Sequence, residues 1–227
     1  MKLFTLGIFA ILSSISFAAP VWYNGDDDGN GGYAALYGTP NGQGNFESHQ
    51  YEDFIWDSSE MASTVMGTMV GTTSFSQIKW EIREGMGIGN NSVGTILASG
   101  TFAPTLVSLG AWTFIPSFTV FKMTGNIGSV TLTNGGTYFL GMAIVVPDPT
   151  FTGGFTTAGP DNAVGSPLNN HSSMWIDSIG NVHDNFNGNT GFNADLSMGI
   201  GTSTVPEPTS LLVIGLGILG LGVKRRK

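Results

Sequence analysis

Alternation of apolar and charged residues is the feature that most constrains how this chain can fold. In the segment SFSQIKWEIRE, three apolar residues alternate with three charged ones, namely Ile78, Trp80 and Ile82 with Lys79, Glu81 and Arg83. Residues spaced by two lie on one face of a β-strand. The segment therefore predicts an antiparallel strand whose apolar face enters a core and whose charged face meets solvent.

The rest of the central region consists of short apolar segments separated by turn residues, without sustained helical periodicity. Thr133–Gly136 is rich in residues that tolerate positive φ and predicts a tight turn before a central strand at 137–146. Further strands are expected at 94–102, at 112–123 with an interruption at Pro116, and at 128–132, 174–179 and 194–200, with loops at 85–92 and 152–170. This spacing predicts an all-β fold, an antiparallel two-sheet sandwich of jelly-roll type.

The N-terminus has the composition of a secretory signal peptide. Lys2 supplies a positive charge, the residues from Leu3 to Phe17 are largely apolar, and Ala18 provides a small residue at a cleavage point. We therefore predict a signal peptide at residues 1–18 and a β-sandwich domain at 19–204. The alternative for the N-terminus is an uncleaved membrane anchor.

The C-terminal segment at 205–227 has three parts. Pro206, Glu207 and Pro208 form a stiff, non-helical tripeptide. Leu211 to Val223 are thirteen residues of only Leu, Val, Ile and Gly, and the chain then ends on the basic residues Lys224, Arg225, Arg226 and Lys227. A short apolar helix of this length spans roughly 20 Å, less than a hydrocarbon core of about 30 Å. We expect a transient anchor, with the basic cluster on the cytoplasmic side of the inner membrane.

This tripeptide, apolar segment and basic end resemble the PEP-CTERM sorting signal of exosortase systems in Gram-negative bacteria. The resemblance covers only the C-terminal segment. It implies recognition and removal of the tail by a membrane-embedded exosortase, and delivery of the body to the cell envelope or the extracellular matrix.

The charge of the body excludes one class of partner. Between residues 19 and 204 the basic residues are Lys79, Arg83 and Lys122, against fifteen acidic ones, so the net charge is near −12 although the full chain carries −8. Such a surface repels nucleic acid backbones, and we expect no DNA or RNA partner. The chain has no cysteine, so its stability depends on core burial or on a metal.

The segment NGDDDGNGG has the oxygen-ligand spacing of the first half of a calcium loop. Asp26, Asp28 and Asn30 occupy alternate positions, and Gly31 follows. The twelfth loop position is Tyr37 rather than a bidentate glutamate. Calcium is therefore one interpretation, and a solvated turn of Asp, Asn and Gly residues is the other.

Catalytic motifs are not evident. The histidines, His49, His171 and His183, share no metal-ligand spacing, and no G-x-S-x-G elbow follows a strand. We expect a protein that is not an enzyme.

Aromatic residues near loops and strand ends suggest a second hypothesis, stacking on sugar rings. They are Trp22, Tyr23, Tyr33, Tyr37, Trp56 and Trp175. The competing interpretation places most of them in the core, since aromatic side chains dominate the interiors of β-sandwiches.

The body also resembles a small all-β module found in exported bacterial proteins. The segments that carry the resemblance are 21–25, 51–54, 80–83, 95–101 and 136–141. We expect a structural or adhesive protein of a biofilm or exopolysaccharide matrix. The alternative is a carbohydrate-binding or calcium-dependent adhesion module.

Overall fold

The computed structural model describes most of the body of the chain. The described residues are 20–38, 46–47, 49–87, 91–146, 151–159, 161–167, 173–177, 180–184 and 195–202. Every strand or helix assigned among them is a β-strand, which confirms the all-β prediction. Ala19–Ser203 forms one unit of the chain. The predicted signal peptide and the predicted C-terminal helix lie outside the described residues.

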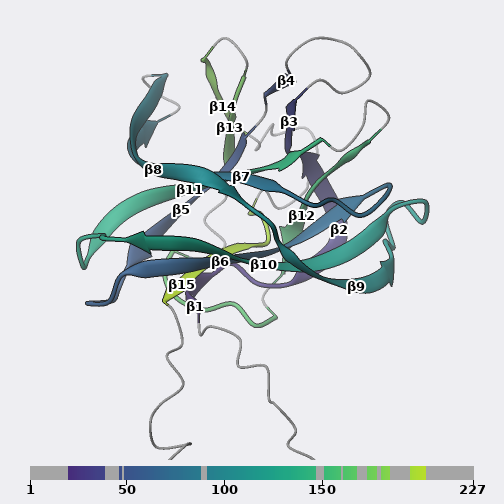
Figure 1. Cartoon of the computed structure of the whole chain (residues 1–227), viewed down its shortest axis with the longest axis horizontal. Helices are drawn as coiled ribbons and strands as arrows, with labels where there is room; N and C mark the ends of the chain where they lie inside the picture. Colours follow the sequence, from purple (N-terminus) through teal and green to yellow (C-terminus); the bar gives the residue numbers. More distant parts are fainter. Residues whose placement is uncertain are drawn as a thin grey trace, which may run out of the picture. The chain divides into compact units, whose positions relative to one another are not determined.

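The first sheet is built around β6 (Ala62–Gly71), which has a strand partner on each side. One side pairs antiparallel with β10 (Thr119–Val130), and the other pairs with β15 (Met198–Thr202) and β12 (Gly153–Ala158). The outer strands are β1 (Pro20–Tyr23) beside β15, β2 (Asp27–Ala34) beside β12, and β9 (Thr105–Ala111) beside β10 (Figure 1).

The second sheet is built around β11 (Gly136–Val145), which lies between β5 (His49–Trp56) and β7 (Ile78–Gly87). The remaining strands are β8 (Ser92–Phe102) beside β7, β13 (Met174–Ile176) and β14 (Val182–Asp184) beyond β5, and β3 (Leu36–Gly38) with β4 (Phe46–Glu47) at the end of β11. The turn predicted before the central strand is confirmed: Gly136 N donates to Thr133 O at 2.9 Å, and Gly135 has φ of 79°.

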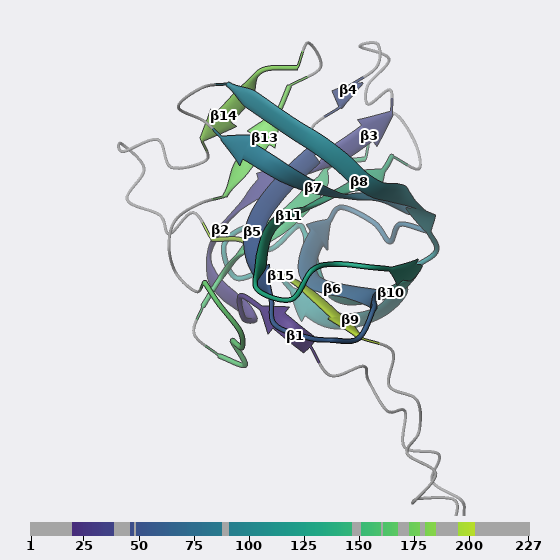
Figure 2. The same cartoon turned by 90° about the vertical axis from the view of Figure 1, so that its left-hand side faces the viewer.

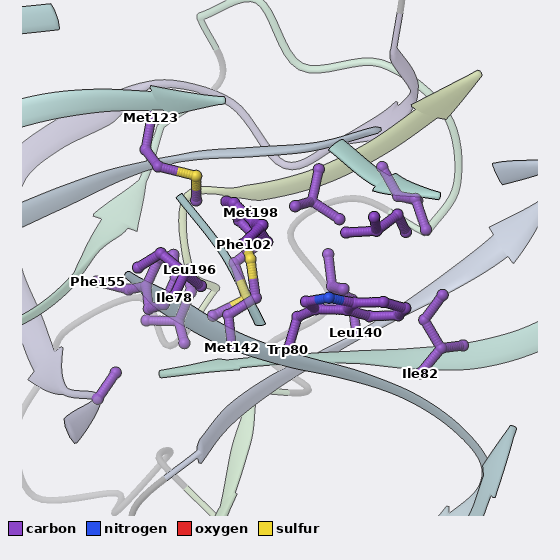
Figure 3. Close-up of a cluster of buried hydrophobic side chains, with 14 of the residues drawn as sticks. Ile78, Trp80, Ile82, Phe102, Met123, Leu140, Met142, Phe155, Leu196 and Met198 are labelled. Atoms are coloured by element: carbon purple, nitrogen blue, oxygen red, sulfur yellow. The ribbon is translucent and has the colours of Figure 1, made fainter. Parts of the chain in front are cut away.

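The core lies between the two sheets, which face each other as the layers of a sandwich (Figure 2). Ile78, Trp80 and Ile82 enter it from β7, as their alternation predicts, together with Leu140 and Met142 from β11. The first sheet contributes Met123, Phe155 and Met198 (Figure 3). The two-sheet arrangement is therefore confirmed, whereas the finer jelly-roll assignment stays a prediction.

Several expected boundaries are wrong: residues 85–87 of the loop expected at 85–92 belong to β7, and the strand expected at 128–132 is not separate, because β10 continues to Val130. Two further segments differ more. The strand expected at 112–123 begins only at Thr119, because Trp112 N donates to Phe118 O at 2.8 Å and closes a turn that contains Pro116. The loop expected at 152–170 contains β12, whose six residues are all buried. Its sequence, GGFTTA, is typical of a loop because it begins with two glycines. In the fold, both glycines occupy positions where neighbouring backbone leaves no room for a Cβ atom.

The charged face of β7 also differs from the expectation, since Glu81 is buried rather than solvated. Its carboxylate accepts hydrogen bonds from the Tyr51 hydroxyl and from Arg83 Nε, the latter at 2.7 Å. Met174 of β13 and Val182 of β14 belong to the small apolar cluster that includes Tyr51. A small apolar cluster therefore lies beside this carboxylate, and alternation alone cannot show such a cluster.

Gly141 on β11 makes room for the Tyr51 ring of that cluster. It pairs directly with Tyr51 across the β5–β11 ladder, and a Cβ atom built on Gly141 would collide with the Tyr51 ring. Gly141→Ala is expected to lower the free energy of unfolding by about 1–3 kcal/mol because the ring must move within a packed cluster. Urea denaturation checks this. The exposed Ser99→Ala on β8 is the control, with an expected change within about 0.5 kcal/mol.

Candidate functional site

The aspartate-rich segment predicted as half of a calcium loop forms a turn at the start of β2. Asp28 Oδ1 accepts from Asn30 N at 2.9 Å, and Asp28 Oδ2 accepts from Asn30 Nδ2 at 3.1 Å. Gly29 between them has φ of 73°, which suits glycine. Asp28 Oδ1 also accepts from Thr157 Oγ1 of β12 at 2.5 Å. The turn is thus attached to the neighbouring strand through Asp28.

Asp26 belongs to a separate network just before β2. Its carboxylate accepts from the Tyr23 hydroxyl at 2.7 Å, from Lys122 Nζ at 3.0 Å and from Asn162 Nδ2 at 2.6 Å. Partial burial by itself raises the pKa of Asp26, but these hydrogen bonds outweigh it and lower the pKa. Asp26 is therefore a charged partner of Lys122.

The calcium interpretation stays a prediction. Asp26, Asp28 and Asn30 are close together in the sequence. In the fold, however, Asp26 binds Lys122 whereas Asp28 binds Thr157. A cation would compete with Lys122 for Asp26 and with Thr157 for Asp28. Among the residues that the structure describes, no three or more His, Asp or Glu side chains are gathered as metal ligands.

An open groove of about 360 Å³ lies beside this network. It is lined by Asp26, Asp27, Leu109, Ala111, Thr113, Val120 and Lys122. Val120 and Lys122 alternate on β10 with the core residues Phe121 and Met123, so the groove lies on the outer face of the first sheet. Carboxylates and an ammonium group can hydrogen-bond hydroxyl groups, while Leu109 and Val120 offer apolar contact. This lining suits a polar ligand with an apolar face, such as a sugar.

A buried acidic cluster lies elsewhere in the fold. Glu52 of β5 and Asp195 are fully buried, and Asn24 is 2 % exposed. Glu52 Oε1 accepts from Leu196 N, and the Asn24 side chain is a further polar neighbour of the Glu52 carboxyl. Burial raises the pKa of Glu52 well above its ordinary value, and the nearby Asp195 carboxylate raises it further. Glu52 is therefore a group that retains its proton into a higher pH range than an ordinary glutamate.

The described histidines, His49 and His183, lie on strands β5 and β14 of the second sheet. His183 Nε2 is 3.0 Å from Asp177 Oδ2, and its ring stacks on Trp175 with the ring centroids 4.2 Å apart. His49 is buried on β5 with its ring 6.0 Å from that of Tyr51. His171 lies outside the described residues. His183 thus pairs with Asp177 rather than with the adjacent Asp184 of the sequence.

The candidate sugar-stacking aromatics divide between core and surface. Trp22, Tyr23 and Trp56 are buried, as the competing interpretation predicted. Tyr33 is partly buried and lines a small pocket of about 150 Å³ with Trp112, Phe114 and Phe118. Sequence reasoning missed these three aromatic residues because it placed them in a strand, although their spacing around Pro116 is a signal for a turn. The side chain of Tyr37 lies outside the described part.

Glu52 yields a prediction about pH. A carboxyl whose pKa is raised by folding binds its proton more tightly in the folded state, so its contribution to stability falls as pH rises above about 4.3, the ordinary glutamate value. Glu52→Gln keeps the acceptor for Leu196 N and removes the titration. We expect the variant to gain stability over the parent protein as pH rises, measured by urea unfolding across a pH series. Asp57→Asn, at an exposed residue just after β5, is the control, and a parallel pH dependence of Glu52→Gln and parent would refute the assignment.

The predicted processing residues lie outside the described residues: Ala18, Pro206, Glu207, Pro208, Lys224, Arg225, Arg226 and Lys227. The described part of the chain contains no helix that is long and apolar enough to cross a membrane.

Comparison with known families identifies one segment. Residues 204–227 match the family model described as the PEP-CTERM protein-sorting motif. No curated protein and no solved structure matches the chain. The motif indicates export, transit through membrane-anchored sorting and processing by an exosortase. The resemblance seen in the tripeptide, apolar segment and basic end is confirmed, and the C-terminal segment of this chain carries a PEP-CTERM sorting motif.

Proposed function

We propose that this chain is a non-enzymatic protein with a structural or adhesive role in the cell envelope or the extracellular matrix of a Gram-negative bacterium. The observation that carries the proposal is the PEP-CTERM match at residues 204–227. A sorting address removes the protein from the cytoplasm and places its body among envelope components and exopolysaccharide. The body then acts after the tail has been removed.

The processing residues have distinct roles in this proposal. Pro206, Glu207 and Pro208 form the recognition element and directly precede the apolar segment in the sequence. Lys224, Arg225, Arg226 and Lys227 hold the end of the tail on the cytoplasmic side of the inner membrane. Ala18 marks the cleavage of the signal peptide at the other end of the chain.

The body supports a role in binding or scaffolding. Two groups of polar side chains are held together by hydrogen bonds within the fold: Asp26 with Lys122, and Glu81 with Tyr51 and Arg83. Such contacts hold loops and strands in place. The strongly acidic surface keeps the body soluble in an aqueous matrix.

The sorting role is tested in the native host by changing Pro206, Glu207 and Pro208 together to alanine. We expect an uncut precursor to accumulate, because the recognition element is lost while the apolar segment and the basic end remain. Immunoblotting of membrane and extracellular fractions measures the ratio of precursor to processed form. Changing Thr209 and Ser210 to alanine is the matched control and should leave processing intact. Unchanged processing of the triple variant would contradict the proposal.

The outer-face groove favours a second candidate function, a carbohydrate-binding or calcium-dependent adhesion module. It combines the carboxylates of Asp26 and Asp27 with the apolar side chains of Leu109 and Val120. Oxygen-rich clefts of this kind suit both sugar hydroxyls and hard cations.

This second candidate predicts that calcium raises the melting temperature of the protein and that a chelator reverses the rise. Asp28→Asn should abolish the calcium effect if the aspartate-rich turn supplies the ligands. Differential scanning calorimetry with calcium, with magnesium and with chelator makes the measurement, and binding to polysaccharide is compared under the same conditions. The absence of any calcium-dependent shift in the parent protein would remove the calcium-dependent form of this candidate.

A further inference from the structure

Each sheet ends on a strand that has a single neighbour in the described part of the fold. β8 pairs with β7 alone, and β9 pairs with β10 alone. The two strands follow one another in the chain through residues 103–104, where the chain passes from the second sheet to the first (Figure 1). Among the described residues, one continuous stretch of the chain therefore supplies one free edge of each sheet.

This stretch has none of the charged residues with which proteins protect such edges. No Asp, Glu, Lys or Arg occurs between Glu84 and Lys122. Its aliphatic side chains are instead exposed: Ile96 is 48 %, Leu97 41 % and Val107 48 % accessible. A long, uncharged, apolar edge strand is a template for pairing with another strand.

Charge indicates which partner fits this surface. The body carries a net charge near −12, so two copies repel one another over most orientations. The uncharged stretch is where two copies can approach without bringing carboxylates together. Antiparallel pairing of a strand with its own counterpart creates a two-fold interface, in which identical residues face each other only at the two-fold axis.

We propose that β8 and β9 form a self-association surface, on which a second copy of this chain docks by edge-to-edge strand pairing. The register shift between Ile82 and Arg83 makes Leu97 an extra residue on β8. A bulge bends and twists the strand and is one of the ways in which proteins limit edge pairing, so a second copy pairs with a short part of β8 beside Leu97 rather than with its whole length. The proposal deepens the structural role proposed above, and its biological meaning rests on that role.

The absence of cysteine from the chain makes a direct test available. Single variants Thr95→Cys, Ile96→Cys, Leu97→Cys and Val107→Cys are expressed as full chains in the native host, where the exported protein meets oxidising conditions. At least one β8 position should give a disulfide-linked homodimer on a non-reducing gel. Met61→Cys and Val164→Cys are the controls, because both residues are exposed hydrophobics outside the two edge strands.

A second substitution tests the pairing itself. Ile96→Glu, added to the cysteine variant that links best, brings two carboxylates to the two-fold interface and should lower the yield of linked dimer by about tenfold or more. Three results would each overturn the proposal: no link from any edge position, equal links from the controls, or links only to a different protein. Linking is read separately from removal of the tail, so failure of self-association with normal processing leaves the sorting role intact.

Discussion

Pairing of β6 with strands on both sides is the constraint on which the rest of the structure depends. β6 holds β10 on one side and both β12 and β15 on the other, so three distant parts of the chain meet on one strand. Nine of its ten positions are buried, which leaves the strand without the alternation that marks a solvated face. The first sheet then offers Met69 and its neighbours to the core, and the second sheet closes over them.

The same arrangement explains what sequence reasoning could and could not reach. β7 and β11 were predictable, because Ile78, Trp80 and Ile82 alternate with polar residues and a glycine-rich turn precedes β11. β12 was missed, since its glycines pack against neighbouring backbone, a contact that exists only after distant strands have paired. For the candidate site, the aspartates could be located in the sequence. Their partners Lys122, Thr157 and Asn162 lie far along the chain and follow no local pattern.

Buried polar groups occupy two settings with opposite electrostatic consequences. Glu81 receives hydrogen bonds from Arg83 and Tyr51, which outweigh its burial and hold its pKa below the ordinary value. Glu52 is fully buried and has an acidic neighbour in Asp195, so its pKa is raised. One carboxyl thus favours the folded state once it is ionised, and the other opposes folding when it loses its proton. Both carboxyls lie in the same sheet, on the two strands that flank β11.

The pairing of the first strand with the last has a consequence for the timing of folding. Pro20 of β1 is the partner of Gly201 of β15, so residues at opposite ends of the body form neighbouring rungs of one ladder. Contacts that close so long a loop form late, since their entropic cost is met only after intervening structure exists. A chain that emerges from a membrane N-terminus first cannot complete this ladder until nearly its whole body has crossed. Translocation thus delivers an unfinished sheet, and the final strand arrives immediately ahead of the sorting segment.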